Sequence, residues 1–223
     1  MKNSPLKIVL TLDQKELSSL NRESIKKVDY LEIRFDLLTK KFVETILIRK
    51  LVFLEKPLIF TIRKSKDSSL KQVEKIPEDM IFQILDEFNT PRNYLDIEMD
   101  SRSIFTQFKN NKFSNICSLH DFKKSISKKK MESLILKNFN PGKKQIFKFA
   151  VTPKNIEEVA IFLDNISSLA KKYSVAAIAM GEIGAVSRIF GDQFGSILTY
   201  CCLNSPKAPG QISIAAMNLF RKF

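Results

Sequence analysis

Short runs of strand-forming residues alternate with amphipathic helical segments along all 223 residues of this chain. Helical spacing of apolar residues predicts helices such as Glu78–Phe88, Ser127–Asn138 and Asn155–Lys172 between the strands. This alternation is typical of βα units whose strands run parallel. The predicted strands are Lys7–Leu12, Tyr30–Asp36, Leu58–Arg63, Tyr94–Asp100, Asn115–His120, Ile146–Thr152, Val175–Met180 and Ile197–Cys202.

No linker rich in Pro, Gly or Ser divides the chain, so residues 1–223 are predicted to form a single domain. Eight βα units in one domain favour a (β/α)8 TIM barrel, which needs about 200 residues or more. An open doubly wound sheet is the alternative. It predicts a glycine-rich phosphate turn after the first strand, where this chain reads Leu12-Asp13-Gln14-Lys15.

Composition narrows the classes of function. The net charge of +13 is compatible with nucleic-acid binding, but the basic residues are spread along the chain and the aromatic residues lie within apolar runs. We therefore expect a solvated basic surface and no nucleic-acid partner. No apolar run approaches the ~18 residues of a membrane span, and the N-terminus lacks signal-peptide features, which predicts a cytoplasmic protein without a membrane partner. Three cysteines and one histidine suggest reduced thiols and no metal site.

Polar and apolar residues alternate within the predicted strands, so each strand has one polar and one apolar face. In a barrel the apolar face packs under the helices, and the polar face must then point inward. A sheet with one face in water would also alternate, but parallel strands joined by helices are rarely one-sided. Burial of many charges indicates a site, because unpaired buried charges destabilise a fold. The residues expected inside the barrel are Glu32, Arg34, Arg63, Asp96, Glu98, His120 and Lys148.

Two of these residues suggest catalysis through a covalent intermediate, one as the nucleophile and the other as an acid/base group. Lys148 is a lone lysine in an apolar strand, where burial should lower its pKa and leave an amine able to attack a carbonyl. His120 ends the preceding strand, and neighbouring strands lie ~4.8 Å apart, so the imidazole is placed to act as general base and acid. An edge-strand lysine and a packed histidine are the alternative interpretations.

Three arginines are candidate anion ligands, because a guanidinium matches the geometry of a carboxylate. Arg63 ends a predicted strand, Arg34 lies two residues before the end of another, and Arg188 follows a glycine-containing loop. A second glycine-containing segment, Pro209-Gly210-Gln211, follows the last strand and is predicted to form a mobile lid.

Taken together, these motifs resemble those of type I 3-dehydroquinate dehydratase, the Schiff-base-forming enzyme of the shikimate pathway. The resemblance extends from Ile8 to Ser213, and its strength lies in the order and spacing of the motifs. The matching motifs are Glu32-Ile33-Arg34, Phe60-Thr61-Ile62-Arg63, Asp96-Ile97-Glu98, Ser118-Leu119-His120-Asp121-Phe122, Lys148-Phe149-Ala150-Val151-Thr152-Pro153, Met180-Gly181, Gly184, Ser187-Arg188 and Ala208-Pro209-Gly210-Gln211.

The resemblance implies a (β/α)8 barrel, often a homodimer, that dehydrates the small molecule 3-dehydroquinate without metal or cofactor. It implies that Lys148 forms the Schiff base and that His120 is the general acid/base. The residues implied to contact the substrate are Glu32, Arg34, Arg63, Arg188, Gln211 and Thr11. Whether the enzyme serves a biosynthetic or a catabolic route stays open.

The chain departs from the family pattern at two positions. Asp67 stands where the family usually has a glutamate near the histidine, so Asp67 is a candidate partner for His120. Lys207 stands where the lid usually has serine. We expect an exposed charge that weakly attracts the substrate carboxylate if the lid closes, and the alternative is a solvated lysine that never reaches the ligand.

Two other functions compete with this hydro-lyase interpretation. A class I aldolase would also use a barrel lysine, but the chain lacks a clear glycine-rich phosphate site after the seventh and eighth strands. A basic nucleic-acid-binding protein would explain the charge, but it would not explain the inward polar face of the strands.

Overall fold

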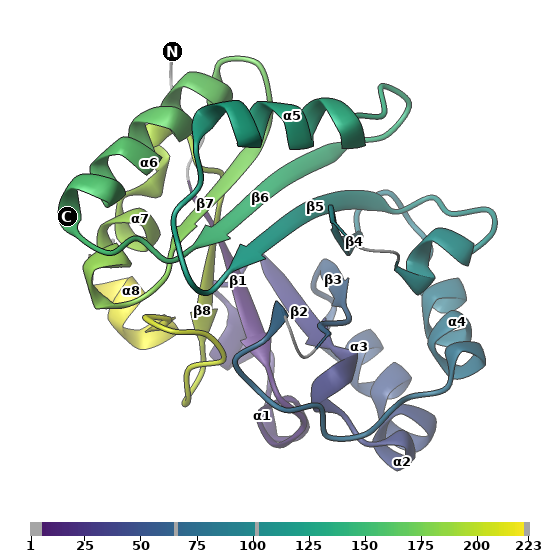
Figure 1. The fold of residues 1–223 in the computed structure, drawn as a ribbon. Coiled ribbons are helices and arrows are strands. Elements are labelled where there is room, and N and C mark those ends of the chain that lie inside the picture. The colour runs from purple at the N-terminus through teal and green to yellow at the C-terminus, as the bar shows by residue number, and fades with distance from the viewer. Residues whose placement is uncertain (1–5, 65–66, 101–102, 221–223) are drawn as a thin grey trace.

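A computed structural model describes residues 6–64, 67–100 and 103–220. Its strands form one curled sheet in the order β7-β6-β5-β4-β3-β2-β1-β8-β9, and all the strand pairings of this sheet are parallel (Figure 1). The strands are β1 (Lys7–Leu12), β2 (Tyr30–Arg34), β3 (Leu58–Thr61), β4 (Tyr94–Glu98), β5 (Ser114–Asp121), β6 (Gln145–Val151), β7 (Val175–Ala179), β8 (Leu198–Cys202) and β9 (Ile212–Ser213).

The two ends of the curled sheet meet between β7 and the start of β8. The backbone nitrogen of Ile197 donates to the Val175 oxygen at 2.9 Å, and Ser196 forms a parallel bridge with Val175. The predicted (β/α)8 barrel is therefore confirmed, because strands, connections and closure all follow that architecture.

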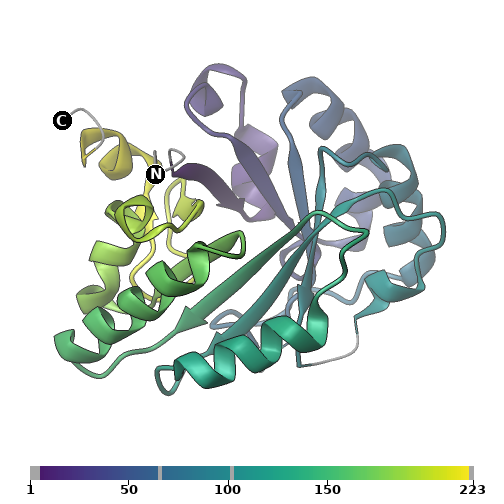
Figure 2. The same cartoon turned by 90° about the horizontal axis from the view of Figure 1, so that it is seen from above.

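Helices cover the outside of the sheet, and Figure 2 shows them around the fanned strands. They are α1 (Gln14–Ser19), α2 (Lys40–Phe42), α3 (Ile48–Leu54), α4 (Glu78–Glu87), α5 (Lys128–Asn138), α6 (Ile156–Ala170), α7 (Ala185–Ile189) and α8 (Ile214–Phe220). A π-helical stretch, Val43–Leu47, joins α2 to α3, and β4 is followed by the short 3-10 helix Ile104–Gln107. None of the described helices is long and apolar enough to cross a bilayer.

Several strands end earlier than the sequence pattern predicts. β2 stops at Arg34 because Phe35–Leu37 turns into a 3-10 helix, and β3 stops at Thr61, before Arg63. At the carboxyl ends of β2 and β3 the chain leaves the sheet and forms the loops on that side of the barrel. The residues at these strand ends therefore sit on loops that can be shaped around a ligand.

The alternation of polar and apolar residues sorts the side chains as predicted. Leu31, Ile33 and Phe60 pack in the cluster that includes Leu51 and Leu85 of the helix layer. A separate apolar cluster fills the floor of the barrel. It includes Val9, Ile59, Ile116, Ile146 and Ala176, from strands β1, β3, β5, β6 and β7. The polar side chains lie above this floor, towards the carboxyl ends of the strands.

Candidate active site

A pocket opens at the carboxyl ends of the barrel strands. The residues predicted to act in catalysis or to contact the substrate line this pocket, although they come from strands and loops spread over the whole chain. They are Thr11, Glu32, Arg34, Arg63, Asp67, His120, Lys148, Arg188, Lys207 and Gln211. Asp96 and Glu98, also expected inside the barrel, are not among its lining residues and contact Lys148 and His120. The pocket is completed by apolar and aromatic side chains, among them Phe122, Ala150, Ile178, Met180 and Tyr200.

Lys148 lies at the base of this pocket, on the inward face of β6. Its side chain is 2% exposed, its Nζ is 2.7 Å from Oδ2 of Asp96, and it lies 4.4 Å from the ring centroid of Tyr200. Burial lowers the pKa of Lys148 below its ordinary value, although Asp96 opposes this shift. A lowered pKa increases the fraction of neutral amine, which is the nucleophilic form.

Asp96 is shared between two cations at the centre of the barrel. Its Oδ2 contacts Arg63 at 2.6 Å as well as Lys148, and its Oδ1 accepts a short hydrogen bond from Ser118. Burial alone would raise the pKa of Asp96, but Arg63 and Lys148 outweigh burial and hold this pKa well below its usual range. Asp96 therefore stays ionised and compensates the buried positive charges.

His120 lines the pocket, and one nitrogen of its ring contacts the carboxylate of Glu98. Its Nδ1 lies 2.6 Å from Oε1 of Glu98, and the same oxygen accepts from Arg63 at 2.5 Å. Glu98 is thus a carboxylate partner of His120 that the sequence analysis did not single out for this role. Asp67 is buried in the same pocket wall, and its support of His120 stays a prediction. Burial and the neighbouring Arg63 lower the pKa of His120 to about 4, against the attraction of Glu98.

This shift predicts that the imidazole of His120 is neutral at physiological pH. Because the chain has one histidine, its ring carbon resonances in an NMR titration report this group alone, and we expect a midpoint near pH 4. The urea-unfolded protein should titrate near pH 6.5 instead. The unfolded state then binds the proton first, so stability should fall as pH drops from about 6.5 to about 4. A folded-state midpoint at 6.5 would contradict the prediction.

Two side chains of β2 are held by different partners. The Glu32 carboxylate accepts hydrogen bonds from Thr11 at 2.7 Å and from Thr61 at 3.0 Å. Arg34 forms a bidentate pair with Asp36, at 2.9 and 2.5 Å, and donates to Ser68 at 3.0 Å. These contacts fix both side chains at the rim of the pocket. Asp36, which the sequence analysis did not select, therefore orients Arg34.

Arg188 is a buried cation of a different kind. Its guanidinium donates to the backbone oxygens of Tyr200 at 3.4 Å and Pro209 at 3.1 Å, and its Nε has no hydrogen-bond partner in the described chain. Arg34 and Arg63 have carboxylate partners, whereas none of the described carboxylates forms an ion pair with Arg188. Burial lowers the pKa of Arg188 to about 10, still above physiological pH. Arg188 is thus an uncompensated positive charge at the pocket and can bind an anion.

The segment after β8 closes one side of the pocket. Gln211 donates to Thr11 at 3.3 Å and accepts from the backbone nitrogen of Lys207 at 2.6 Å. The expectation of an exposed charge at Lys207 is wrong. Its side chain is only 3% exposed, because its ammonium is drawn between Asp13 and Glu16.

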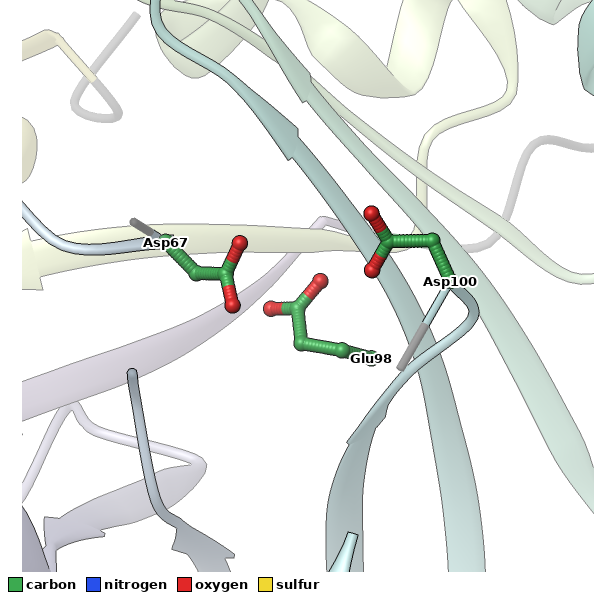
Figure 3. Close-up of side chains that lie close together, drawn as sticks. All are labelled: Asp67, Glu98 and Asp100. Atoms are coloured by element: carbon green, nitrogen blue, oxygen red, sulfur yellow. The ribbon is translucent and has the colours of Figure 1, made fainter. Parts of the chain in front are cut away.

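Three carboxylates converge near His120, which spacing in the sequence did not reveal. Oxygen atoms of Asp67, Glu98 and Asp100 lie within 4.8 Å of one another, as Figure 3 shows for the three side chains. The guanidinium of Arg63 lies 2.5 Å from Glu98 and already compensates the negative charge of this carboxylate. A metal ion bound beside Glu98 would be repelled by the guanidinium.

We therefore still expect activity without a divalent metal ion. Treatment with EDTA followed by desalting should leave the rate unchanged, because arginine and lysine already supply the positive charge. Loss of activity that a divalent ion restores would contradict this expectation and make Asp67, Glu98 and Asp100 the first candidate ligands.

Sequence reasoning missed the contact of Tyr200 with Lys148. The ring is buried on β8, the hydroxyl has no partner in the described chain, and burial followed by Asp96 raises the pKa of Tyr200 well above its ordinary value. The tyrosine therefore stays neutral, and its ring face can stabilise a cation at Lys148 Nζ. The one signal in the sequence is the position of Tyr200 on β8, where the alternation of side chains points it into the barrel.

Comparison with known proteins agrees with this arrangement. The family model for Type I 3-dehydroquinase matches residues 7–222. The 3-dehydroquinate dehydratase of Staphylococcus saprophyticus is 29% identical, over 95% of this chain and 95% of its own. The crystal structure of the 3-dehydroquinate dehydratase from Aquifex aeolicus VF5 is 26% identical, with a TM-score of 0.75 over 97% of this chain and 98% of its own. The corresponding structure from Geobacillus kaustophilus has a TM-score of 0.77 at 22% identity, over 98% and 91% of the two chains.

Proposed function

Because this chain belongs to the type I 3-dehydroquinase family, we propose that it dehydrates 3-dehydroquinate to 3-dehydroshikimate through a Schiff base on Lys148. The observation that supports this most directly is the buried amine of Lys148, which lies in one pocket with His120 and the uncompensated cation Arg188. A nucleophile, an acid/base group and an anion ligand are the three parts that this reaction needs.

Arg188 is the residue we assign to the substrate carboxylate. A carboxylate at this position would form a charge-assisted pair and satisfy the unpartnered Nε. Arg34 and Arg63 are already paired with Asp36 and with Asp96 and Glu98, so they present less net charge. Glu32, Thr11 and Gln211, joined by hydrogen bonds, are placed to bind substrate hydroxyls.

The covalent step begins at Lys148. Its neutral Nζ attacks the C3 ketone, and the carbinolamine takes up a proton from water on its hydroxyl and loses water to give an iminium ion. The positive charge returns to Nζ in the iminium, between the Asp96 carboxylate and the face of Tyr200. Both neighbours stabilise a cation at that atom, so the site that binds the resting ammonium also favours the intermediate.

Elimination is then assigned to His120. The neutral imidazole removes a proton from C2, and the electron pair moves into the iminium to form an enamine. The enamine expels the C1 hydroxyl, which leaves as water after taking the proton from His120. Hydrolysis of the remaining iminium releases 3-dehydroshikimate and restores the Lys148 amine.

The direct test is turnover of purified protein with 3-dehydroquinate, followed through the ultraviolet absorbance of the conjugated enone product. A second sample is treated with borohydride during turnover, and the intact mass is measured. Formation of 3-dehydroshikimate with a covalent adduct supports the proposal, whereas turnover without any trapped adduct contradicts the Schiff-base step. The family match leaves the class I aldolase and nucleic-acid-binding interpretations without support.

We further propose a cytoplasmic homodimer. Cys117, Cys201 and Cys202 form no disulfide in the structure, as is usual for proteins of a reducing compartment. Self-association is supported by an apolar groove between α6 and the segment around α7, which Ile156 and Phe194 line, and by exposed apolar side chains on these two parts of the chain. These side chains are Ile156, Ile161, Ile183 and Phe190. Light scattering in solution should give twice the chain mass of 25.6 kDa.

A further inference from the structure

The ammonium of Lys207 is bound between two carboxylates of the β1–α1 connection. Its Nζ lies 2.7 Å from Oδ2 of Asp13 and 3.0 Å from Oε2 of Glu16. It also donates to the hydroxyl and the backbone oxygen of Ser205, at 2.8 and 3.0 Å. A lysine ammonium has three protons, so these acceptors satisfy it fully and leave no proton for a ligand.

The same two carboxylates organise the backbone on both sides of the contact. Asp13 and Glu16 form the capping box at the start of α1, in which each side chain accepts from the backbone of the other. The second oxygen of Glu16 accepts from the backbone nitrogens of Asn204, at 3.0 Å, and Ser205, at 3.4 Å. Glu16 of the first helix thus holds the segment after β8 both by its ion pair with Lys207 and by hydrogen bonds from the backbone of Asn204 and Ser205.

From Lys207 the chain runs directly into the pocket wall. The Lys207 backbone nitrogen fixes the Gln211 side chain, and the Pro209 oxygen accepts from Arg188 and from the backbone nitrogen of Gly181. Gly210 adopts a positive φ of +68°, and a Cβ there would lie 2.3 Å from the Gly181 oxygen. The segment is therefore packed tightly against the loop after β7, and its position also decides where Arg188 and Gln211 lie.

We propose that Lys207 is a positioning residue that clamps residues 204–211 over the pocket through Asp13 and Glu16. The clamp acts on substrate binding by holding Gln211 and the Pro209 oxygen in place, and the Lys207 charge does not contact the substrate. Only the identity of the substrate in this statement rests on the function proposed above.

The pKa values of Lys207 and Asp13 keep both side chains charged near neutral pH, as a clamp based on an ion pair requires. Burial by itself lowers the pKa of Lys207, but the hydrogen bonds that its ammonium donates to Asp13 and Glu16 outweigh burial and raise this pKa above its ordinary value. The pKa of Asp13 is lowered, because hydrogen bonds from the Glu16 backbone and Lys207 outweigh the opposing effect of burial. Lys207 and Asp13 are therefore charged together across neutral pH, and the contact between Lys207 and Glu16 is buried, with side chains 3% and 4% exposed.

The clamp is tested without any substrate by amide hydrogen exchange. In Lys207→Met, exchange of the amides of residues 204–211 should be at least about tenfold faster than in the wild type, because a buried charged hydrogen bond is lost. Lys123→Met is the matched control, since Lys123 is exposed in the loop after β5 and forms no ion pair in the described chain. Exchange of residues 204–211 should be unchanged in the control. Wild-type exchange rates in Lys207→Met would overturn the proposal.

A double variant tests the clamp in case the single variant Lys207→Met fails to fold. Lys207→Met leaves Glu16 buried without its cation, so Glu16→Gln/Lys207→Met removes the ammonium and the buried carboxylate charge while retaining the capping side chain of Asp13. This double variant should fold and still exchange rapidly at residues 204–211. Slow, wild-type-like exchange in a folded double variant would also overturn the proposal.

Kinetics separate a clamp from electrostatic attraction of the substrate. We expect Lys207→Met to raise KM about tenfold with kcat within about threefold, and this effect should persist at high salt because the buried pair is poorly screened. Lys207→Arg, which keeps the charge, should recover most of the loss in KM. Equal KM changes in Lys207→Met and Lys123→Met that vanish with salt would contradict the clamp. If the wild type fails to turn over 3-dehydroquinate, the proposed function fails, whereas hydrogen exchange still decides on the clamp.

Discussion

Replacement of Lys148 by alanine should reduce turnover of 3-dehydroquinate by about 10⁴-fold or more, because the covalent nucleophile is lost. The variant should fold, since Asp96 keeps Arg63 and Ser118 as partners and so remains compensated. Borohydride treatment during turnover should add the mass of reduced adduct to the wild type, and peptide mapping should place it on Lys148. No adduct should form on Lys148→Ala.

Lys144→Ala provides the control for this experiment. Lys144 precedes β6 at the opposite end of the strand and is exposed, so its removal changes the charge without touching the pocket. It should retain both turnover and trapping at Lys148. An adduct on a different lysine, or a Lys148→Ala protein with normal activity, would contradict the mechanism.

Replacement of His120 by alanine should lower kcat by about 10²- to 10⁴-fold, the range typical of a general acid/base. Imine formation depends on the amine more than on the imidazole, so borohydride should still trap substrate on Lys148. Glu98 keeps its pair with Arg63 in this variant, and we therefore expect the fold to persist. Rapid-quench mass measurement gives the adduct, and steady-state absorbance gives kcat.

The outcome that would exclude His120 from acid/base chemistry is near-normal kcat in His120→Ala. Loss of both turnover and trapping would instead place His120 in imine formation. Glu98→Gln is an informative companion, because it removes a negative charge beside the imidazole while retaining a side chain of similar shape. It should reduce kcat less than His120→Ala does.

Much of the fold could be predicted from the chain alone. The alternation of polar and apolar residues in the strands decides which side faces the helices, because a parallel strand covered by helices must bury its apolar side. The prediction for β1 was correct at both ends, and the helices Glu78–Glu87 and Lys128–Asn138 differ from their predictions by one residue at one end. These segments have strong periodicity and clear end signals, such as Ser127 as N-cap.

The strand ends were predicted less well. Residues 35–37 continue the polar and apolar alternation of β2, yet they form a 3-10 helix in which Asp36 turns back to bind Arg34. The short β9, Ile212–Ser213, was also missed, because two residues beside the end of β8 show no periodicity. Such features depend on contacts with neighbouring loops rather than on local propensity.

The chain sequence determined the barrel, the inward face of its strands and most of the polar residues that line the pocket, since strand parity and the order of the motifs can be read along the chain. The tertiary structure decided which of these charges compensate one another. Glu98 contacts His120, Asp36 orients Arg34, and Asp96 is shared by Arg63 and Lys148.

It also left Arg188 without a described carboxylate partner and buried Lys207 between Asp13 and Glu16, two residues nearly two hundred positions away. The reason is physical: the interaction of two charges depends on their distance and burial, and both are set only when the barrel closes and brings the first helix beside the segment that follows β8.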